Sequence, residues 1–479
     1  MWQGVAFAFV VSTPAAEWNR NTTAPRASAT CGGRAAAVSL SLRDVLSRRR
    51  CAAGAHIVFI AMSSMGSMIM RGMLPDSVLN QTFERHGVRS SFLHPPPRFV
   101  GFTQLLERHL ATHGEPSICV VIKFAHAPVQ EVCRARGALV LLDNIDNPDG
   151  FDALQVRNQH YRSVDAVLVQ TREHAAWLAT HDHRAIVLPH PHGNIGGWSL
   201  APSARKRLRG VGFVVGDIGR NMPRPAEVRA LAEACCRADA SLFIVFTSDK
   251  GFRISPYSLN TTYYKSKGMP RNLTAAPAAA RLAATCGGVG GGSAGRGGAG
   301  RGGACEALPS LGACVAGATA PVADEANASG LGGTLDLDTT RQRRFYESEE
   351  MLKLIDVGVV WHPGHQLGGH NAVHNRPPTR MAWWWSHGIP VVGYPMAAYT
   401  EGASRVGYPL ALLNVSTPAR LEHALCSIAS REERACLQRA ALRGAMLTGP
   451  QHSSLELIAG ACKLAEICEK PIPGAVRVH

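Results

Sequence analysis

The stretch AVLVQTREHAAWLATHDHRAIVLP, Ala166 to Pro189, indicates the fold class of this chain. Its two ends are short apolar runs, which predict buried strands, and the residues between them repeat apolar side chains at helical spacing. Thr171 stands where a side chain can cap the first turn of this helix. A strand, a helix and a strand in succession predict two parallel strands of an open α/β sheet.

The same alternation begins at His56. The apolar runs that predict strands are 56–62, 118–124, 138–143, 166–170 and 185–189. Amphipathic stretches that predict the helices between them are 101–114, 128–137, 149–164 and 171–182. Because continuous apolar runs are typical of parallel strands covered on both faces, we expect an N-terminal Rossmann-like domain over 55–195.

The alternation restarts after PHPHGNIGGW, 189–198, which predicts a second Rossmann-like domain over 205–465 and a hinge near 190–205. Its predicted strands are 210–216, 241–248, 356–363 and 389–395, and its predicted helices are 224–238, about 346–355, 417–428 and 431–447. A length of 479 residues also favours two cores over one. The expected fold is therefore α/β, with two doubly wound parallel-sheet domains facing each other across a crevice and C-terminal helices that return toward the first domain.

Three segments are left outside the predicted fold. Residues 1–54 are rich in Ala, Ser and Arg and begin with an apolar run, which combines features of a transit peptide and of a signal peptide. Residues 274–335 consist mainly of Gly and Ala, so they are expected to form a disordered, low-complexity insertion. Residues 466–479 are a tail. The insertion contains strings similar to GxGxxG, but no predicted strand precedes them, which argues against a nucleotide loop.

The net charge of +15 does not by itself indicate a nucleic-acid partner. The leader accounts for part of it, with seven arginines and two acidic residues, and the other basic residues are scattered, with no long basic run and no stripe of basic and aromatic residues. This distribution favours a phosphate-bearing small ligand over a nucleic acid. Since no run approaches about 18 apolar residues, no transmembrane span is expected, although peripheral membrane contact remains open.

Thirteen cysteines form no CxxC pair, and Cys119 and Cys133 lie where buried free thiols are usual. No acidic set accompanies His190 and His192, so no metal site is expected. Six N-x-S/T sequons favour the secretory pathway or Golgi over a plastid: Asn21, Asn80, Asn260, Asn272, Asn327 and Asn414.

The segment NRPPTRMAWWWSHGIPVVGYP, 375–395, predicts a helix that starts near Pro377 and ends at Gly388. Arg376 and Arg380 are four residues apart, hence on one face, beside unpaired backbone amides at the positive end of the helix. Such a combination binds phosphate, whereas a solvated pair of surface arginines is the plainer interpretation. The tryptophans at 383–385 cannot all face one way, so core packing and a place near a ligand or domain seam both remain open.

Taken together, these segments resemble glycosyltransferases of the GT-B fold, in particular the group 1 glycosyltransferases, over about 56–265 and 340–465. The resemblance implies a nucleotide-sugar donor held mainly by the second domain, with no further cofactor. It places the donor diphosphate at the glycine-rich loop GDIGRN, where Gly216, Gly219 and Arg220 match, and at Thr379 and the two arginines of the 375–395 segment. Glycines that admit backbone amides and a planar guanidinium suit a diphosphate.

The chain departs from that family at two positions. Many group 1 enzymes carry a pair of glutamates where this sequence has Asn375 and Trp383. The resemblance still places Asn375 in the donor site and Glu401 near the donor sugar. Loss of the pair keeps open a degenerate GT-B protein that binds a glycan or partner without turnover; a sugar-nucleotide epimerase of the same fold is a further alternative.

Polar residues after the first-domain strands are expected to face the crevice. His126, Asp143 and Asp146 stand at such positions, where a neutral imidazole could take a proton from an acceptor hydroxyl and a carboxylate could orient it. Together with these residues, the resemblance to group 1 glycosyltransferases implies an enzyme, a hexosyltransferase or related transferase. Its acceptor, whether glycan, lipid or protein, is not indicated.

Overall fold

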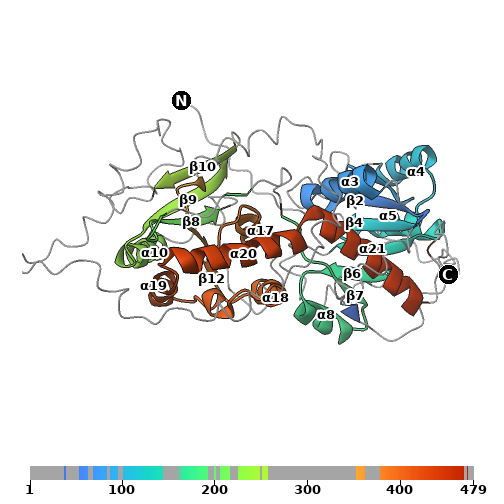
Figure 1. Ribbon diagram of the computed structural model, residues 1–479. Coiled ribbons are helices and arrows are strands. Elements are labelled where there is room, and N and C mark those ends of the chain that lie inside the picture. Colours follow the sequence, from blue (N-terminus) through green and yellow to red (C-terminus); the bar gives the residue numbers. More distant parts are fainter. Residues whose placement is uncertain are drawn as a thin grey trace, which may run out of the picture.

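The computed structural model describes residues 37–38, 53–62, 68–83, 87–94, 101–143, 161, 163–192, 199–200, 205–215, 225–248, 251–256, 352–361, 378–468 and 472. They form two α/β lobes placed side by side (Figure 1). The first lobe comprises the elements β1 to β7 with α3, α4, α5, α8 and α21, and the second comprises β8 to β12 with α10 and α17 to α20. The predicted insertion, 274–335, lies outside the described residues.

The sheet of the first lobe is parallel throughout its described part, in the order β1-β7-β6-β5-β4-β2-β3. Its strands are β1 (Ala37–Val38), β2 (His56–Ala61), β3 (Arg89–Leu93), β4 (Ile118–Ile122), β5 (Leu139–Asp143), β6 (Ala166–Val169) and β7 (Ala185–Val187). From β2 the chain steps outward to β3 and then back to β4. This reversal of direction makes the sheet doubly wound, as predicted.

Helices cover both faces of this sheet. Ile57 and Phe59 pack on the face that carries α3 (Leu74–Val78) and α21 (Pro450–Ile467). Val58 and Ile60 pack on the opposite face, beneath α4 (Phe102–His113), α5 (Ala127–Ala135) and α8 (Arg172–Ala179). Every residue of β2 is buried, and fully burying one such side chain contributes about 1.5–3 kcal/mol. Continuous apolar strands are thus explained by two covered faces.

Two strands of this sheet differ from the expectation. β1 lies within 1–54, which the sequence analysis left outside the fold, yet Ala37 and Val38 pair with β7. Strand β3 has the polar sequence RSSFL and was not predicted. It is an edge strand, where Ser91 accepts or donates a hydrogen bond at 2.9 Å with His56 and again with His109. Neither strand carries the apolar run on which the prediction relied.

The sheet of the second lobe has the order β10-β9-β8-β11-β12, parallel except for the β9–β10 pair. Its strands are β8 (Gly210–Val215), β9 (Ser241–Ser248), β10 (Gly251–Pro256), β11 (Val357–Val360) and β12 (Val391–Gly393). Its helices are α10 (Pro225–Arg237), α17 (Thr379–Ser386), α18 (Ala397–Arg405), the 3-10 turn η6 (Leu410–Leu413), α19 (Pro418–Ser427) and α20 (Arg431–Leu447). The α/β fold with two Rossmann-like lobes is therefore as predicted.

The tryptophan run of α17 is core. Trp384 lies against two glycines of the sheet, since a Cβ added at Gly212 or Gly358 would come within 2.5 Å of its ring. Trp385 packs against Tyr408, with ring centroids 5.3 Å apart, and Trp383 packs against His387 at 4.6 Å. The three side chains face three ways and all are buried, and Trp385 also lines the pocket between the lobes.

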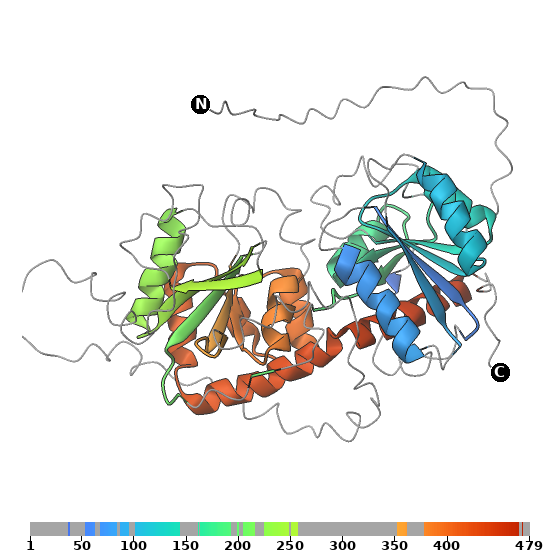
Figure 2. The same ribbon diagram turned by 90° about the horizontal axis from the view of Figure 1, so that it is seen from above.

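Helix α21 follows the second sheet in the chain but packs against the first. Figure 2 shows α20 leading from the second lobe toward α21 under the first. Leu457, Ile458 and Leu464 belong to the same apolar cluster as Ile57 and Phe59. The returning chain is also tied to the first crossing, because the backbone N–H of His192 donates to the carbonyl of Thr448 at 2.8 Å. Two crossings therefore join the lobes.

Two cysteines differ from the expectation of free thiols. Cys119 of β4 and Cys133 of α5 form a disulfide, which their positions in one cluster on one face of the sheet allow. Cys235, in α10, is a buried free thiol. None of the described helices is both long and apolar enough to cross a membrane.

Candidate functional site

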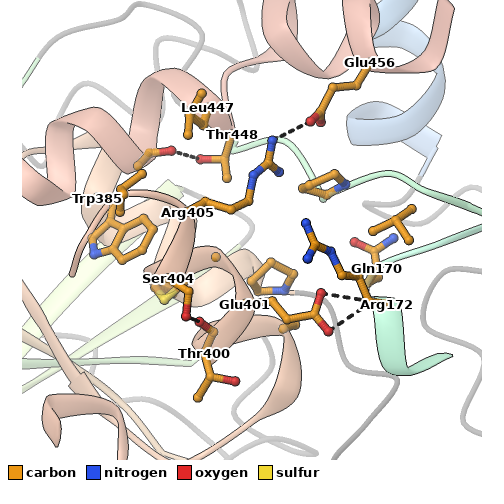
Figure 3. Close-up of a pocket in the computed structure, with 18 of the residues that line it drawn as sticks. Gln170, Arg172, Trp385, Thr400, Glu401, Ser404, Arg405, Leu447, Thr448 and Glu456 are labelled. Carbon is orange, nitrogen blue, oxygen red and sulfur yellow. Dashed lines mark hydrogen bonds and ion pairs between the residues drawn. The ribbon is translucent and has the colours of Figure 1, made fainter. Parts of the chain in front are cut away.

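A pocket of about 540 Å³ lies between the lobes (Figure 3). From the first lobe it is lined by residues at the ends of strands β6 and β7 and by Glu456 of α21, and from the second mainly by helices α17, α18 and α20. The polar lining residues are Gln170, Arg172, Thr400, Glu401, Ser404, Arg405, Thr448 and Glu456. Both its size and its place at the carboxyl ends of parallel strands are typical of a ligand site.

Glu401 reaches across the pocket from α18 to the start of α8. Its two carboxylate oxygens accept hydrogen bonds from the backbone N–H of Arg172 at 3.0 and 2.9 Å, and Oε1 lies 3.5 Å from that of Glu173. Thr171 caps the same helix, since its hydroxyl accepts from the N–H of His174 at 3.1 Å. The carboxylate thus occupies the positive end of a helix in the other lobe, where an anion is favoured.

A second charge contact crosses between α18 and α21. Arg405 Nη2 lies 2.5 Å from Glu456 Oε1, and His452 Nε2 lies 3.4 Å from the same oxygen. Glu456 is buried, which raises its pKa, but the neighbouring His452 and the charge of Arg405 outweigh burial and leave the pKa below its usual value. Glu456 is therefore a carboxylate at neutral pH.

Two polar groups of the pocket wall are unsatisfied. Within the described residues, neither Nε2 nor Oε1 of Gln170 has a hydrogen-bond partner, although the side chain is only 4% exposed. Oε2 of Glu456 is likewise buried without a partner in this part of the chain. Buried amides and carboxylates without partners are costly and rare in folded proteins. Their place in a pocket wall indicates groups that a ligand would satisfy.

Asp143, predicted to act on the acceptor, lies at the end of β5 and is 1% exposed. Its two oxygens accept from Arg71, at 2.6 Å from Nε and 3.2 Å from Nη2. Arg71 also donates to the carbonyls of Leu188 and Pro189, which follow β7. The ion pair thus joins the ends of two strands beneath the surface, and Asp143 does not line the pocket.

His126, also predicted on the acceptor side, is the N-cap of α5. Its Nδ1 accepts from the backbone N–H of Val129 at 3.4 Å, which in the neutral ring puts the proton on Nε2. It does not line the pocket. Asp146 lies outside the described residues. The structure therefore separates His126 and Asp143 from the charged pocket.

Of the predicted donor-site residues, three are described. Thr379 begins α17, and Arg380 donates from Nη1 to the carbonyl of Trp361, at the end of β11, at 2.8 Å. Glu401 is the third, and of these three it alone is among the residues that line the pocket. The remainder lie outside the described residues: Gly216, Gly219, Arg220, Asn375 and Arg376.

Sequence reasoning missed Gln170, Arg172, Arg405 and Glu456. A signal existed for the first two, because Gln170 and Arg172 follow a predicted strand as Asp143 does. Glu456 stands in an apolar stretch of α21, where a single acidic residue indicates a buried carboxylate that needs a basic partner. Among the described residues, no three His, Cys, Asp or Glu side chains gather as metal ligands would.

Comparison with known proteins finds similarity in fold and none in sequence. No family profile matches the chain, and no curated protein matches it. Solved structures that match include trehalose-6-phosphate synthase OtsA, at 10% identity and a TM-score of 0.38, over 88% of this chain and 84% of that one. The N-terminal domain of Candida albicans trehalose-6-phosphate phosphatase matches at 9% identity and a TM-score of 0.44, over 86% and 97%.

A third match is the structure of accessory secretory protein 1, 2 and 3 in Streptococcus pneumoniae, at 11% identity and a TM-score of 0.37, over 77% of this chain. This chain spans 57% of the length of the chain it matches there. The protein itself has two Rossmann-like lobes, each with its own sheet, and a helix, α21, that returns from the second lobe to pack on the first, as in the GT-B fold.

Proposed function

We propose that the protein is a glycosyltransferase that moves a sugar from a nucleotide-sugar donor to an acceptor hydroxyl. The observation that carries the proposal is the charged pocket between the two lobes, at the carboxyl ends of β6 and β7 and beside the start of α17. Pockets at this edge of an open α/β sheet bind ligands, and a site built from two lobes can hold a donor and an acceptor together.

The donor side of the proposal rests on α17. The bond from Arg380 to the carbonyl of Trp361 fixes the guanidinium at the end of β11, and the buried tryptophans hold the helix in place. We propose that Thr379, Arg380 and the neighbouring Asn375 and Arg376 bind the donor diphosphate, together with the Gly216, Gly219 and Arg220 loop. Cations at this point would stabilise the nucleoside diphosphate as the glycosidic bond breaks.

The acceptor side of the proposal is constrained by the contacts of its candidates. His126 could take a proton on Nδ1 only by giving up the cap of α5. The oxygens of Asp143 are held by Arg71, so its proposed part is to position the ends of β5 and β7 rather than to contact substrate. Asp146 keeps its proposed role as an orienting carboxylate.

The test is turnover and nucleotide binding by the full chain. We expect transfer or hydrolysis of at least one radiolabelled nucleotide-sugar. We also expect Arg380→Ala to weaken nucleoside diphosphate binding about ten- to a hundredfold in calorimetric titrations, because one charge-assisted phosphate contact is lost. Arg431→Ala, an exposed arginine at the start of α20, is the control and should leave the affinity unchanged. Equal affinities in both variants would contradict the donor assignment.

One observation favours a second candidate, a GT-B protein that binds its ligand without turnover. Trp383 stands at a position where many group 1 enzymes have a glutamate, and it is buried in the core with 8% exposure. Nucleoside diphosphate binding that depends on Arg380, with no consumption of any nucleotide-sugar, would favour this candidate over the enzyme.

A further inference from the structure

The N-terminus of α8 is an anion site that the protein fills with its own side chain. Glu401 supplies the carboxylate, at 3.0 and 2.9 Å from the N–H of Arg172. These hydrogen bonds are exposed, and a charge held at an exposed helix end is screened by solvent and bound only weakly. An anion from solution can therefore compete with Glu401 at little cost.

The neighbouring side chain points to an external ligand. Gln170 immediately precedes the cap of α8, is buried at 4% exposure, and has neither amide atom satisfied within the described chain. Figure 3 shows its amide in the pocket wall beside the Arg172 side chain. An amide that offers both a donor and an acceptor matches a hydroxyl group, which can serve as both.

The charges around this point favour an anionic ligand over a neutral one. Arg172 and Arg405 both line the pocket, and the carboxylate of Glu456 is engaged by Arg405. Once Glu401 is displaced, the Arg172 guanidinium and the positive end of α8 would both be available to an anionic ligand. A volume of about 540 Å³ accommodates a molecule of sugar size that carries an acidic group.

We propose that the acceptor is a hydroxylated molecule bearing an oxyanion, a phosphate monoester or a carboxylate, which binds at the start of α8 and displaces Glu401 while Gln170 bonds a hydroxyl. Its assignment as the acceptor rests on the proposed glycosyltransferase function; the oxyanion site itself does not. Glu401 belongs to α18 of the second lobe, so its displaced carboxylate would no longer contact the first lobe.

The experiment is calorimetric titration of the full chain, without donor, using glucose 6-phosphate, glucuronate and glucose as probes. Glu401→Ala removes the competing carboxylate and should tighten binding of the anionic probe about fivefold. Gln170→Met removes the amide at similar volume and should weaken it about tenfold. Glu432→Ala, an exposed glutamate in the first turn of α20 away from the pocket, is the matched control and should change nothing.

Each outcome decides the proposal. If only glucose 6-phosphate binds more tightly than glucose, the ligand is a phosphate monoester. If only glucuronate binds more tightly than glucose, the ligand is a carboxylate. The proposal is overturned if glucose binds as well as both anions, or if Glu401→Ala and Glu432→Ala leave the same affinities. Circular dichroism and the melting temperature show that each variant is folded. If the variants change the affinity for the anionic probe as expected but no nucleotide-sugar is turned over, the proposed function is contradicted and the oxyanion site is still supported.

Discussion

Asp143 and Gln170 occupy neighbouring strand ends of one sheet, and both are buried, yet their surroundings differ. Asp143 ends β5 and pairs in register with Leu168 of β6, two residues before Gln170. Both oxygens of Asp143 are held by Arg71, whereas neither amide atom of Gln170 has a partner among the described residues. Asp143 lies under the surface, and Gln170 forms part of the pocket wall.

This difference separates two uses of a polar residue at a strand end. A buried carboxylate with a bidentate arginine is already satisfied and holds neighbouring strand ends together. A buried amide without partners is a cost to the free protein that a ligand can remove. Asp143 was selected from the sequence because it stands at the carboxyl end of a predicted strand, and Gln170 stands at such an end as well. Whether the side chain already has a hydrogen-bond partner, rather than its position on the strand, therefore indicates which residue is available to a ligand.

The largest effect is expected at the satisfied strand end. Asp143→Leu should destabilise the protein by about 3–5 kcal/mol, because it leaves the buried guanidinium of Arg71 uncompensated. The measurement is urea denaturation followed by circular dichroism. The double variant Arg71→Met with Asp143→Leu removes both charges and should recover most of the loss. A loss of less than about 1 kcal/mol in the free energy of unfolding of the single variant would show that the Arg71–Asp143 pair does not hold the ends of β5 and β7 together.

A smaller effect on the free energy of unfolding is expected at His190, which follows β7, the strand on the far side of β6 from β5. Burial, and then the charge of Arg71, lower its pKa to about 3. The unfolded chain therefore binds the proton first as pH falls below about 6.5, so this contribution to stability is complete above pH 6.5 and is lost progressively down to about pH 3. Between pH 6.5 and 5 one such histidine should cost about 1–1.5 kcal/mol.

His190→Asn keeps a side-chain donor for the carbonyl of Pro191, which lies 2.8 Å from Nδ1, and removes the titration. Its urea midpoint should fall less between pH 6.5 and 5 than that of the wild type. Burial also lowers the pKa of His192 and His387 to about 4, so the wild-type slope has further sources that the variant retains. Equal slopes in the two proteins would place His190 outside the pH dependence.

The smallest effect on stability is expected at the unsatisfied strand end. Gln170→Met replaces a buried amide without partners by an apolar chain of similar volume, so the free energy of unfolding should stay within about 0.5 kcal/mol or rise. The same urea denaturation measures it. A loss above about 1.5 kcal/mol would mean that the amide has a structural partner, and the contrast with Asp143 would then disappear.

The alternation of apolar runs and amphipathic stretches was sufficient to predict both sheets, because it reflects strands buried on two faces. It could not find β3, where Ser90 and Ser91 suit a polar edge, or β1, which is only two residues long. It also missed β10, the edge strand of the second sheet, which pairs antiparallel with β9. Local pattern also predicted the cap at Thr171 and the start of α17 close to Pro377.

The candidate site depends on contacts that local pattern does not contain. Arg71 meets Asp143 across 72 positions and Glu401 meets Arg172 across 229. A sequence shows which residues are able to pair, but the pairing partner is set by the tertiary arrangement. For this reason the bond from Glu401 to the start of α8 could not be foreseen, and its expected place near the donor sugar stays a prediction.

The place of α21 has a consequence for the order in which the protein is synthesised. The apolar face that contains Ile57 and Phe59 is closed by Leu457 and its neighbours, which leave the ribosome long after β7. At about 5–20 residues per second, the part of that face that α21 covers stays exposed for on the order of tens of seconds, although α3 already packs on the rest. We therefore expect the nascent first lobe to need a chaperone until translation passes Pro450, and a transcript truncated before this codon to yield aggregated product instead of an isolated first lobe.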